Sequence, residues 1–116
     1  MSEQQKRWTD DQEIAYEVAI KYINEMRGLF SRQMAIIDDE KKKDAYLKRW
    51  LELGKEEDRL DGFNDAMIKD VIDTYSELYK EYYNMDDSEE EIAAKGLPEK
   101  FLTTKIDYAK YKKDNQ

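Results

Sequence analysis

The chain has 116 residues, a formal net charge of −8 and charged side chains at 41% of its positions, with no Cys and no His. The missing cysteines exclude disulfides, thiolate nucleophiles and iron–sulfur ligation, and the missing histidines exclude imidazole catalysis and ordinary zinc sites. The apolar residues recur periodically and 12% of the residues are aromatic, which predicts a folded chain and not a disordered one. We expect one helical domain over 1–116, with frayed ends at 1–8 and 112–116.

The first long helix is predicted over about 9–37. Thr9 and Gln12 have the spacing of a capping box, and the acidic residues of the first turn suit the positive end of the helix dipole. At about 100° per residue, a set of apolar side chains falls within one wide arc. These residues are Ala15, Ala19, Tyr22, Ile23, Met26, Leu29, Phe30, Met34, Ile36 and Ile37. The arc predicts that this is the core helix, with Phe30 buried near its middle.

A second helix is predicted from the charge run at 38–44 to about residue 57, because acids ahead of bases suit a first helical turn. Its apolar stripe is expected to consist of Tyr46, Leu47, Trp50 and Leu51. The segment 58–65 contains Asp, Gly and Asn, which favour a turn with caps at hand. The alternative is a single helix that runs on through Gly62.

The third helix, over about 64–84, has the clearest two-sided pattern. Its apolar face is expected to contain Met67, Ile68, Val71, Tyr75, Leu78, Tyr79 and Tyr82. Ser88 and Glu91 then form a second capping box, for a short helix that ends at Gly96. Pro98 suits the first turn of a last helix. That helix is expected to carry Phe101, Leu102, Ile106 and Ala109.

These elements predict an all-α fold. No alternating pattern bounded by turns indicates a strand, and the short connections favour antiparallel neighbours. We therefore expect a small antiparallel helical bundle of two or three long amphipathic helices plus short C-terminal helices. No apolar stretch has the length of a membrane span, and the N-terminus lacks a signal-like apolar core, so we expect a cytoplasmic protein that does not bind membranes.

The negative charge is concentrated in the middle of the chain. Residues 52–94 include 15 acidic and 4 basic side chains, whereas 95–116 include 3 acidic and 6 basic ones. Asp73, Glu77 and Glu81 follow at spacings of four, which places them along one face of a helix. Such a face suits a basic partner or mimics nucleic acid. The alternative interpretation is an ordinary solvated helix face.

Eight residues are the candidates for partner contact: Asp65, Asp70, Asp73, Glu77, Glu81, Tyr83, Asp86 and Asp87. Tyr83 is included because a tyrosine offers a large contact area with few rotamers. The acidic run 86–91 lacks both the Gly and the final Glu of a calcium loop, so a helix cap is the favoured interpretation. We expect no metal, no cofactor and no catalytic residue.

The C-terminal end is basic, with Lys105, Lys110, Lys112 and Lys113. On a chain of this net charge, a solvated tail or pairing with the acidic middle is favoured over nucleic-acid binding.

The sequence thus predicts a non-enzymatic acidic binding protein that inhibits or neutralises a basic partner, such as a nucleic-acid-processing enzyme or a toxin. Immunity proteins, antitoxins, and anti-restriction and anti-CRISPR proteins are small acidic helical proteins of this kind, an analogy of composition alone. The alternative is a helical self-assembling scaffold or adaptor. In it, a second copy completes the broad apolar faces of the first and third helices, so a homodimer is a further expectation.

Overall fold

A computed structural model describes residues 7–111, and this part of the chain contains α-helices, two short 3-10 helices and no strand. The long helices are α1 (Asp10–Ile36), α2 (Glu40–Glu56) and α3 (Asp65–Tyr83), and the short ones are α4 (Glu89–Lys95) and α5 (Lys100–Thr103). The 3-10 helix η1 (Glu57–Arg59) continues from α2, and η2 (Tyr108–Tyr111) ends the described chain. The all-α prediction is confirmed. Of the ends expected to fray, 1–6 and 112–116 lie outside the described residues, whereas Trp8 is half-buried and packs against Tyr16 and Phe63.

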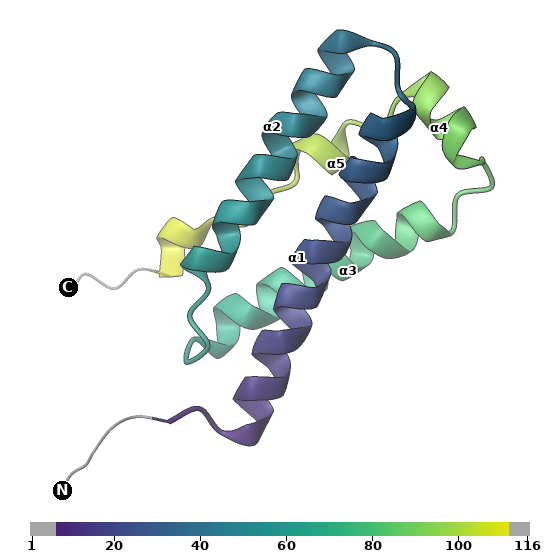
Figure 1. The fold of residues 1–116 in the computed structure, drawn as a ribbon. Helices are drawn as coiled ribbons and strands as arrows, with labels where there is room; N and C mark the ends of the chain where they lie inside the picture. The colour runs from purple at the N-terminus through teal and green to yellow at the C-terminus, as the bar shows by residue number, and fades with distance from the viewer. Residues whose placement is uncertain (1–6, 112–116) are drawn as a thin grey trace, which may run out of the picture.

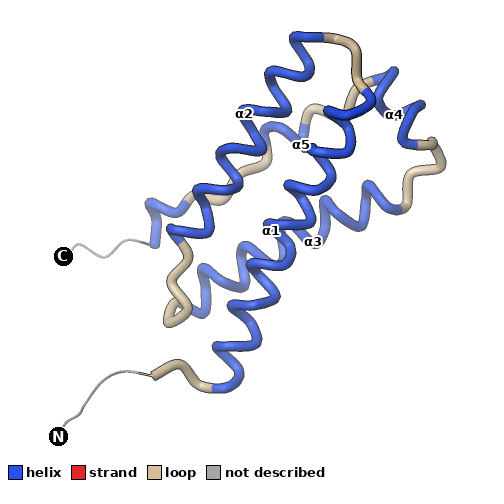
Figure 2. Tube along the Cα trace, viewed as in Figure 1, coloured by secondary structure: helices blue, strands red, loops and turns tan. Residues whose placement is uncertain are grey.

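α1 is the central element, and it packs against both α2 and α3 (Figure 1). α2 returns alongside α1 in the opposite direction after the short connection at 37–39, and α3 crosses α1 obliquely. α4 lies at the C-terminal end of α1, and the loop after α5 runs back along α2 (Figure 2). The arrangement is the antiparallel bundle that the short connections predict.

The prediction that α1 is the core helix is confirmed. The Thr9 hydroxyl accepts a hydrogen bond from the Gln12 backbone N–H, and the Gln12 side chain accepts one from the Thr9 N–H, which completes the capping box. Met26, Leu29 and Phe30 are fully buried. Burying one such side chain contributes roughly 1.5–3 kcal/mol relative to leaving it exposed. The apolar arc of α1 is therefore covered by this chain's own helices.

The chain turns between α2 and α3, so the alternative of one continuous helix is wrong. The Asn64 side chain caps α3 by accepting a hydrogen bond from the Met67 N–H at 3.0 Å. Gly62 is buried beneath Trp8, and a Cβ at this glycine would lie 2.4 Å from the indole ring. Glycine is therefore required at this turn, because its lack of a side chain lets the indole approach the backbone.

α2 buries a different face from the one predicted. Tyr46 is buried as expected, but Leu47 is 44% exposed and Leu51 is 49% exposed. Arg49 and Glu56 lie on the buried side with Tyr46 instead, and they are 2% and 5% exposed. The apolar pattern predicted the wrong phase because a buried ion pair fills positions that an apolar stripe would normally hold.

α4 forms as the sequence predicts. Ser88 and Glu91 make the reciprocal bonds of a capping box. Gly96 ends the helix with a φ of 88°, a conformation that glycine adopts without strain. The next N–H, of Leu97, donates to the Tyr46 hydroxyl at 2.9 Å, which joins this end of α4 to α2.

The last helix is shorter than predicted. α5 ends at Thr103, so Ile106 and Ala109 do not continue the helix that holds Phe101. Thr103 and Thr104 are β-branched, and such residues disfavour helix. The Thr104 carbonyl also accepts a hydrogen bond from the Arg49 guanidinium at 3.1 Å, so a tertiary contact holds it outside a helix.

Candidate functional site

The residues expected to contact a partner follow the outer face of α3 and the loop after it. The exposed ones are Asp65, Asp73, Glu77, Tyr83 and Asp86. The half-buried ones are Asp70, Glu81 and Asp87. A helix of 19 residues is about 28 Å long, so these side chains form an extended surface and not one cluster. Tyr83 is 72% exposed, and its ring lies edge-on to Tyr79 at 5.0 Å between centroids.

Lysines of the same chain pair with four of these carboxylates. The pairs are Lys69–Asp73 at 2.6 Å, Lys95–Asp87 at 2.9 Å, Lys100–Glu81 at 2.5 Å and Lys110–Asp70 at 3.7 Å. All four lysine side chains are more than half exposed. Exposed pairs of this kind contribute only about 0–1 kcal/mol, so a partner's cation can replace the lysine at little cost.

The prediction that the basic end pairs with the acidic middle is confirmed for the described lysines. Lys110 pairs with Asp70, and Lys105 pairs with Glu52 at 3.3 Å. Lys112 and Lys113 lie outside the described residues. In contrast, Glu77 and Asp86 have no ion-pair or hydrogen-bond partner within 7–111, so their charges face solvent uncompensated.

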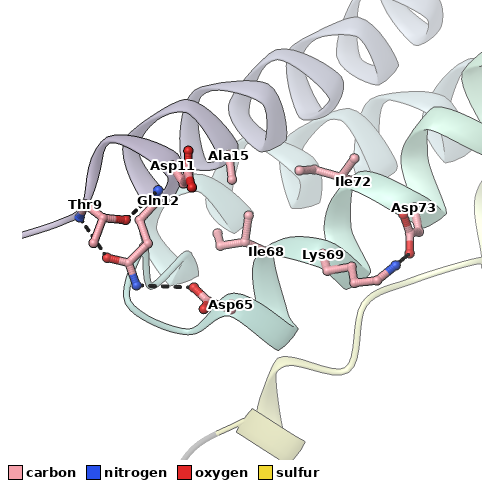
Figure 3. Close-up of a pocket in the computed structure, with 10 residues that line it drawn as sticks. Thr9, Asp11, Gln12, Ala15, Asp65, Ile68, Lys69, Ile72 and Asp73 are labelled. Atoms are coloured by element: carbon pink, nitrogen blue, oxygen red, sulfur yellow. Dashed lines mark hydrogen bonds and ion pairs between the residues drawn. The ribbon is translucent and has the colours of Figure 1, made fainter.

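A groove between the N-terminal parts of α1 and α3 brings two of the predicted residues, Asp65 and Asp73, onto one cavity wall (Figure 3). The cavity holds about 450 Å³. Asp11, in the first turn of α1, adds a third carboxylate from the opposite side, and the Gln12 amide donates to Asp65 at 3.2 Å. Asp11 is not among the candidates that the sequence predicts, because only the packing of α1 on α3 brings it near the other two.

The floor of this groove is apolar. Ala15 lies on the α1 side and Ile68 and Ile72 lie on the α3 side. The one cation that lines the groove within the described chain is Lys69, which pairs with Asp73. The hydrogen bond to Asp73, together with its charge, raises the pKa of Lys69, so this lysine is fully ionised near neutral pH. The groove thus has carboxylates at its rim and aliphatic carbons at its base.

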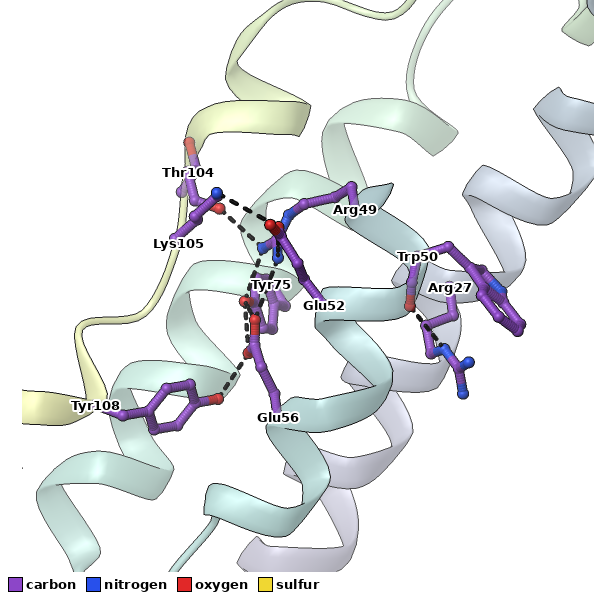
Figure 4. Close-up of polar contacts among 9 residues, drawn as sticks. All are labelled: Arg27, Arg49, Trp50, Glu52, Glu56, Tyr75, Thr104, Lys105 and Tyr108. Atoms are coloured by element: carbon purple, nitrogen blue, oxygen red, sulfur yellow. Dashed lines mark hydrogen bonds and ion pairs between the residues drawn. The ribbon is translucent and has the colours of Figure 1, made fainter. Parts of the chain in front are cut away.

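A second group of polar side chains is buried between α2, α3 and the C-terminal segment (Figure 4). The Glu56 carboxylate accepts hydrogen bonds from the Tyr75 hydroxyl at 2.7 Å, the Tyr108 hydroxyl at 2.7 Å and the Arg49 guanidinium at 3.3 Å. Arg49 also donates to the Tyr75 hydroxyl at 3.0 Å and to the Thr104 carbonyl at 3.1 Å. We name these five residues the Glu56 cluster.

The electrostatics of the Glu56 cluster favour a fixed structural role. Burial raises the pKa of Tyr75 and Tyr108, and the neighbouring Glu56 carboxylate raises both further. Burial opposes the charge of Arg49, but Tyr75 and Glu56 outweigh it and the pKa of Arg49 is raised. Because the Glu56 oxygens already accept several bonds, the carboxylate is poorly placed to act as a general base. The cluster instead fastens the C-terminal segment to α2 and α3.

One further contact attaches the C-terminal segment to α3, at the edge of the acidic surface. The Tyr111 hydroxyl donates to Asp70 at 2.7 Å, and this hydrogen bond is the main cause that raises the pKa of Tyr111. Asp70 therefore belongs to the attachment of the C-terminal segment more than to a free binding surface. Its half-buried position is consistent with that role.

The Glu56 cluster was missed because its members look unremarkable in the sequence. The apolar pattern predicts Tyr75 as a core residue only, and it includes neither Arg49 nor Glu56. A signal does exist, since Tyr46, Arg49, Leu53 and Glu56 follow the alternating spacings of three and four that mark a buried helix face.

The described residues contain no group of three or more His, Cys, Asp or Glu side chains that could hold a metal ion. Within the same part of the chain, no helix combines the length and apolar character needed to cross a membrane. Comparison of the sequence with protein-family models and curated proteins, and of the fold with solved structures, gives no match.

Proposed function

We propose that the chain is a non-enzymatic acidic binding protein that neutralises or inhibits a basic protein partner, such as a nucleic-acid-processing enzyme or a toxin. The observation that carries the proposal is the groove between α1 and α3. Asp11, Asp65 and Asp73 surround an apolar floor in a cavity of about 450 Å³. A Lys or Arg side chain has the complementary form, an aliphatic stem with a cationic end.

The outer face of α3 extends this surface beyond the groove. Glu77 lies one turn after Asp73 and is exposed, and Glu81 follows it by another turn. Asp73 and Glu81 are paired with Lys69 and Lys100, but exposed pairs are weak and are exchanged readily. A basic partner would take over these carboxylates, and the anionic face would also speed its approach at low salt.

The spacing of the free charges favours a basic protein segment over close mimicry of a phosphate backbone. Internal lysines interrupt the row of carboxylates at Asp73 and Glu81 and leave Glu77 unpaired between them. A mimic of nucleic acid would gain from an unbroken row of negative charges. Recognition of a few Lys or Arg side chains needs only separate acidic positions.

The test compares two triple variants that change the net charge equally. The groove variant carries Asp11→Asn, Asp65→Asn and Asp73→Asn, and the control carries Asp38→Asn, Asp58→Asn and Glu99→Gln at exposed positions outside the groove. The probe is a short fluorescent Arg-rich peptide, whose binding is followed by anisotropy at low and high salt. We expect the groove variant to lose at least about tenfold in affinity, equivalent to about 1.4 kcal/mol, and the control to lose much less.

Equal losses in the two triple variants would show that only net charge attracts the peptide, and the groove would then have no role. Binding by the parent that does not weaken as salt rises would also contradict the proposal, because contacts between exposed charges are screened by salt.

A further inference from the structure

α2 presents an apolar pair to solvent. Leu47 and Leu51 are one turn apart and remain 44% and 49% exposed. The buried side of α2 is occupied by Tyr46 and Leu53 and by the Glu56 cluster, so the two leucines point away from the bundle. Two exposed leucines on neighbouring turns of one helix lie side by side and form a small apolar strip.

Two charges of opposite sign flank this strip on the same face. Asp44 lies three residues before Leu47, and Lys55 lies four residues after Leu51. Both are exposed, and neither has an ion-pair partner within residues 7–111. We name Asp44, Leu47, Leu51 and Lys55 the α2 outer face.

We propose that the α2 outer face binds the same face of a second copy of this chain, with the two α2 helices antiparallel. In a two-fold symmetric pair, the antiparallel direction places Asp44 of each copy near Lys55 of the other and brings the four leucines together at the centre. A parallel pair would place Asp44 against Asp44 and Lys55 against Lys55, which is repulsive. The order of charges along the helix therefore selects the antiparallel direction.

This surface differs from those that the sequence predicted for a dimer. The apolar arc of α1 and the tyrosine-rich face of α3 are covered by helices of the same chain. α2 has 17 residues and is about 26 Å long, so one helix pair lies at the small end of specific interfaces. We expect a dimer that dissociates in the micromolar range. It uses a different face from the groove of the proposed function, so either proposal can fail alone.

The first test is sedimentation equilibrium of the full chain from about 5 to about 500 µM, which brackets a dissociation constant in the tens of micromolar. We expect the parent to shift from monomer to dimer across this range and the Leu47→Glu/Leu51→Glu variant to stay monomeric. Ile14→Glu is the control for a charge at an exposed apolar position, since Ile14 is 60% exposed on α1 and should leave the dimer intact. Circular dichroism confirms that each variant retains its helices. A parent that is monomeric at every concentration overturns the proposal.

The second test reverses the flanking charges. Asp44→Lys alone and Lys55→Asp alone each place like charges together twice in the dimer, so each should weaken association by about tenfold or more. The double variant Asp44→Lys/Lys55→Asp restores opposite charges across the interface and should return to within a few fold of the parent. If the double variant is weaker than both single variants, the antiparallel pairing of the α2 outer face is wrong.

Discussion

Ion pairs behave differently on α2 and on α3. On the inner side of α2, Arg49 and Glu56 have side chains that are 2% and 7% exposed, and they bond to each other at 3.3 Å. On the outer side of α3, Lys69 and Asp73 approach even closer, at 2.6 Å, yet their side chains are 76% and 60% exposed. Distance alone would rank the α3 pair as the stronger one, and burial reverses that order.

This difference in burial indicates separate roles for the inner side of α2 and the outer side of α3. A buried charge whose partner is removed cannot regain water, so the Arg49–Glu56 pair fixes the position of the segment that carries Thr104 and Tyr108. An exposed charge regains water at once, so Asp73 can leave Lys69 for another cation. The inner pair is suited to hold the fold together, and the outer pairs are suited to reversible binding.

The largest effect is expected for Glu56→Gln, which removes the buried counter-charge of Arg49 and leaves it only the partly exposed Glu52. Removing one partner of a buried pair typically costs about 3–5 kcal/mol, so the free energy of unfolding in urea should fall by that amount. Glu52→Gln is the control, because Glu52 also contacts Arg49, at 3.5 Å, but its side chain is 34% exposed. A loss for Glu56→Gln no greater than that for Glu52→Gln would contradict a structural role for the buried pair.

Two tyrosine variants compare the same deletion at a buried and at a more exposed hydroxyl. Tyr108→Phe removes a hydrogen bond to buried Glu56, and bonds to charged groups contribute about 1.5–3 kcal/mol. Tyr111→Phe removes the bond to the half-buried Asp70, and we expect a loss below about 1 kcal/mol. Urea denaturation of both variants measures the difference. Equal losses of unfolding free energy in the two variants would mean that burial does not make the Tyr108 hydrogen bond the stronger one.

Stability should fall in alkali because the Glu56 cluster keeps two tyrosines protonated. The pKa of Tyr75 and of Tyr108 is raised by burial and by Glu56, whereas the unfolded chain releases these protons near pH 10. The contribution of the two tyrosines to the free energy of unfolding is therefore fully present below about pH 10. Above that pH it falls by about 1.4 kcal/mol per pH unit for each tyrosine. Melting temperatures measured across this range should decline less steeply for Tyr108→Phe. An identical decline in that variant would place the alkaline sensitivity elsewhere.

The smallest stability effect is expected on the acidic face. The triple variant Asp73→Lys, Glu77→Lys and Glu81→Lys removes two weak pairs and places new lysines near Lys69 and Lys100. Because all of these side chains reach solvent, the loss in unfolding free energy should stay below about 1 kcal/mol. Binding of the Arg-rich peptide should nevertheless be lost. Normal binding together with normal stability would mean that Asp73, Glu77 and Glu81 form only an ordinary solvated helix face.

The sequence predicts the helices whose buried faces are mainly apolar, although α1 also buries the polar Gln33. α1 and α3 have such faces, and the burial of Phe30 and Val71 follows from their spacing. α2 breaks the pattern, because Arg49 and Glu56 replace apolar residues inside while Leu47 and Leu51 lie outside. The spacing of Tyr46, Arg49, Leu53 and Glu56 is compatible with this exchange but does not specify it, since the buried ion pair needs partners from α3 and the C-terminal segment.

The sequence predicts the negative charge of the candidate site but not the contacts that its residues make with distant parts of the chain. The four-residue spacing of Asp73 and Glu77 shows that both share the outer face of α3. The pairing of Glu81 with Lys100, and the approach of Asp11 to Asp65 across the groove, depend on how distant segments pack. Sequence spacing describes neighbours on one helix only, so it cannot reveal contacts between elements.

In this account, the carboxylates of the groove and of the outer face of α3 exchange internal lysines for a partner's cations, while the Glu56 cluster stays fixed. Titration of the isotope-labelled chain with the Arg-rich peptide, followed by backbone amide NMR, tests it most directly. We expect the largest shifts at residues 9–15 and 62–73, which include Asp65 and Asp73, and at Glu77, with little change at Arg49, Tyr75 and Tyr108. Shifts concentrated at the Glu56 cluster, or spread evenly over the chain, would contradict the claim.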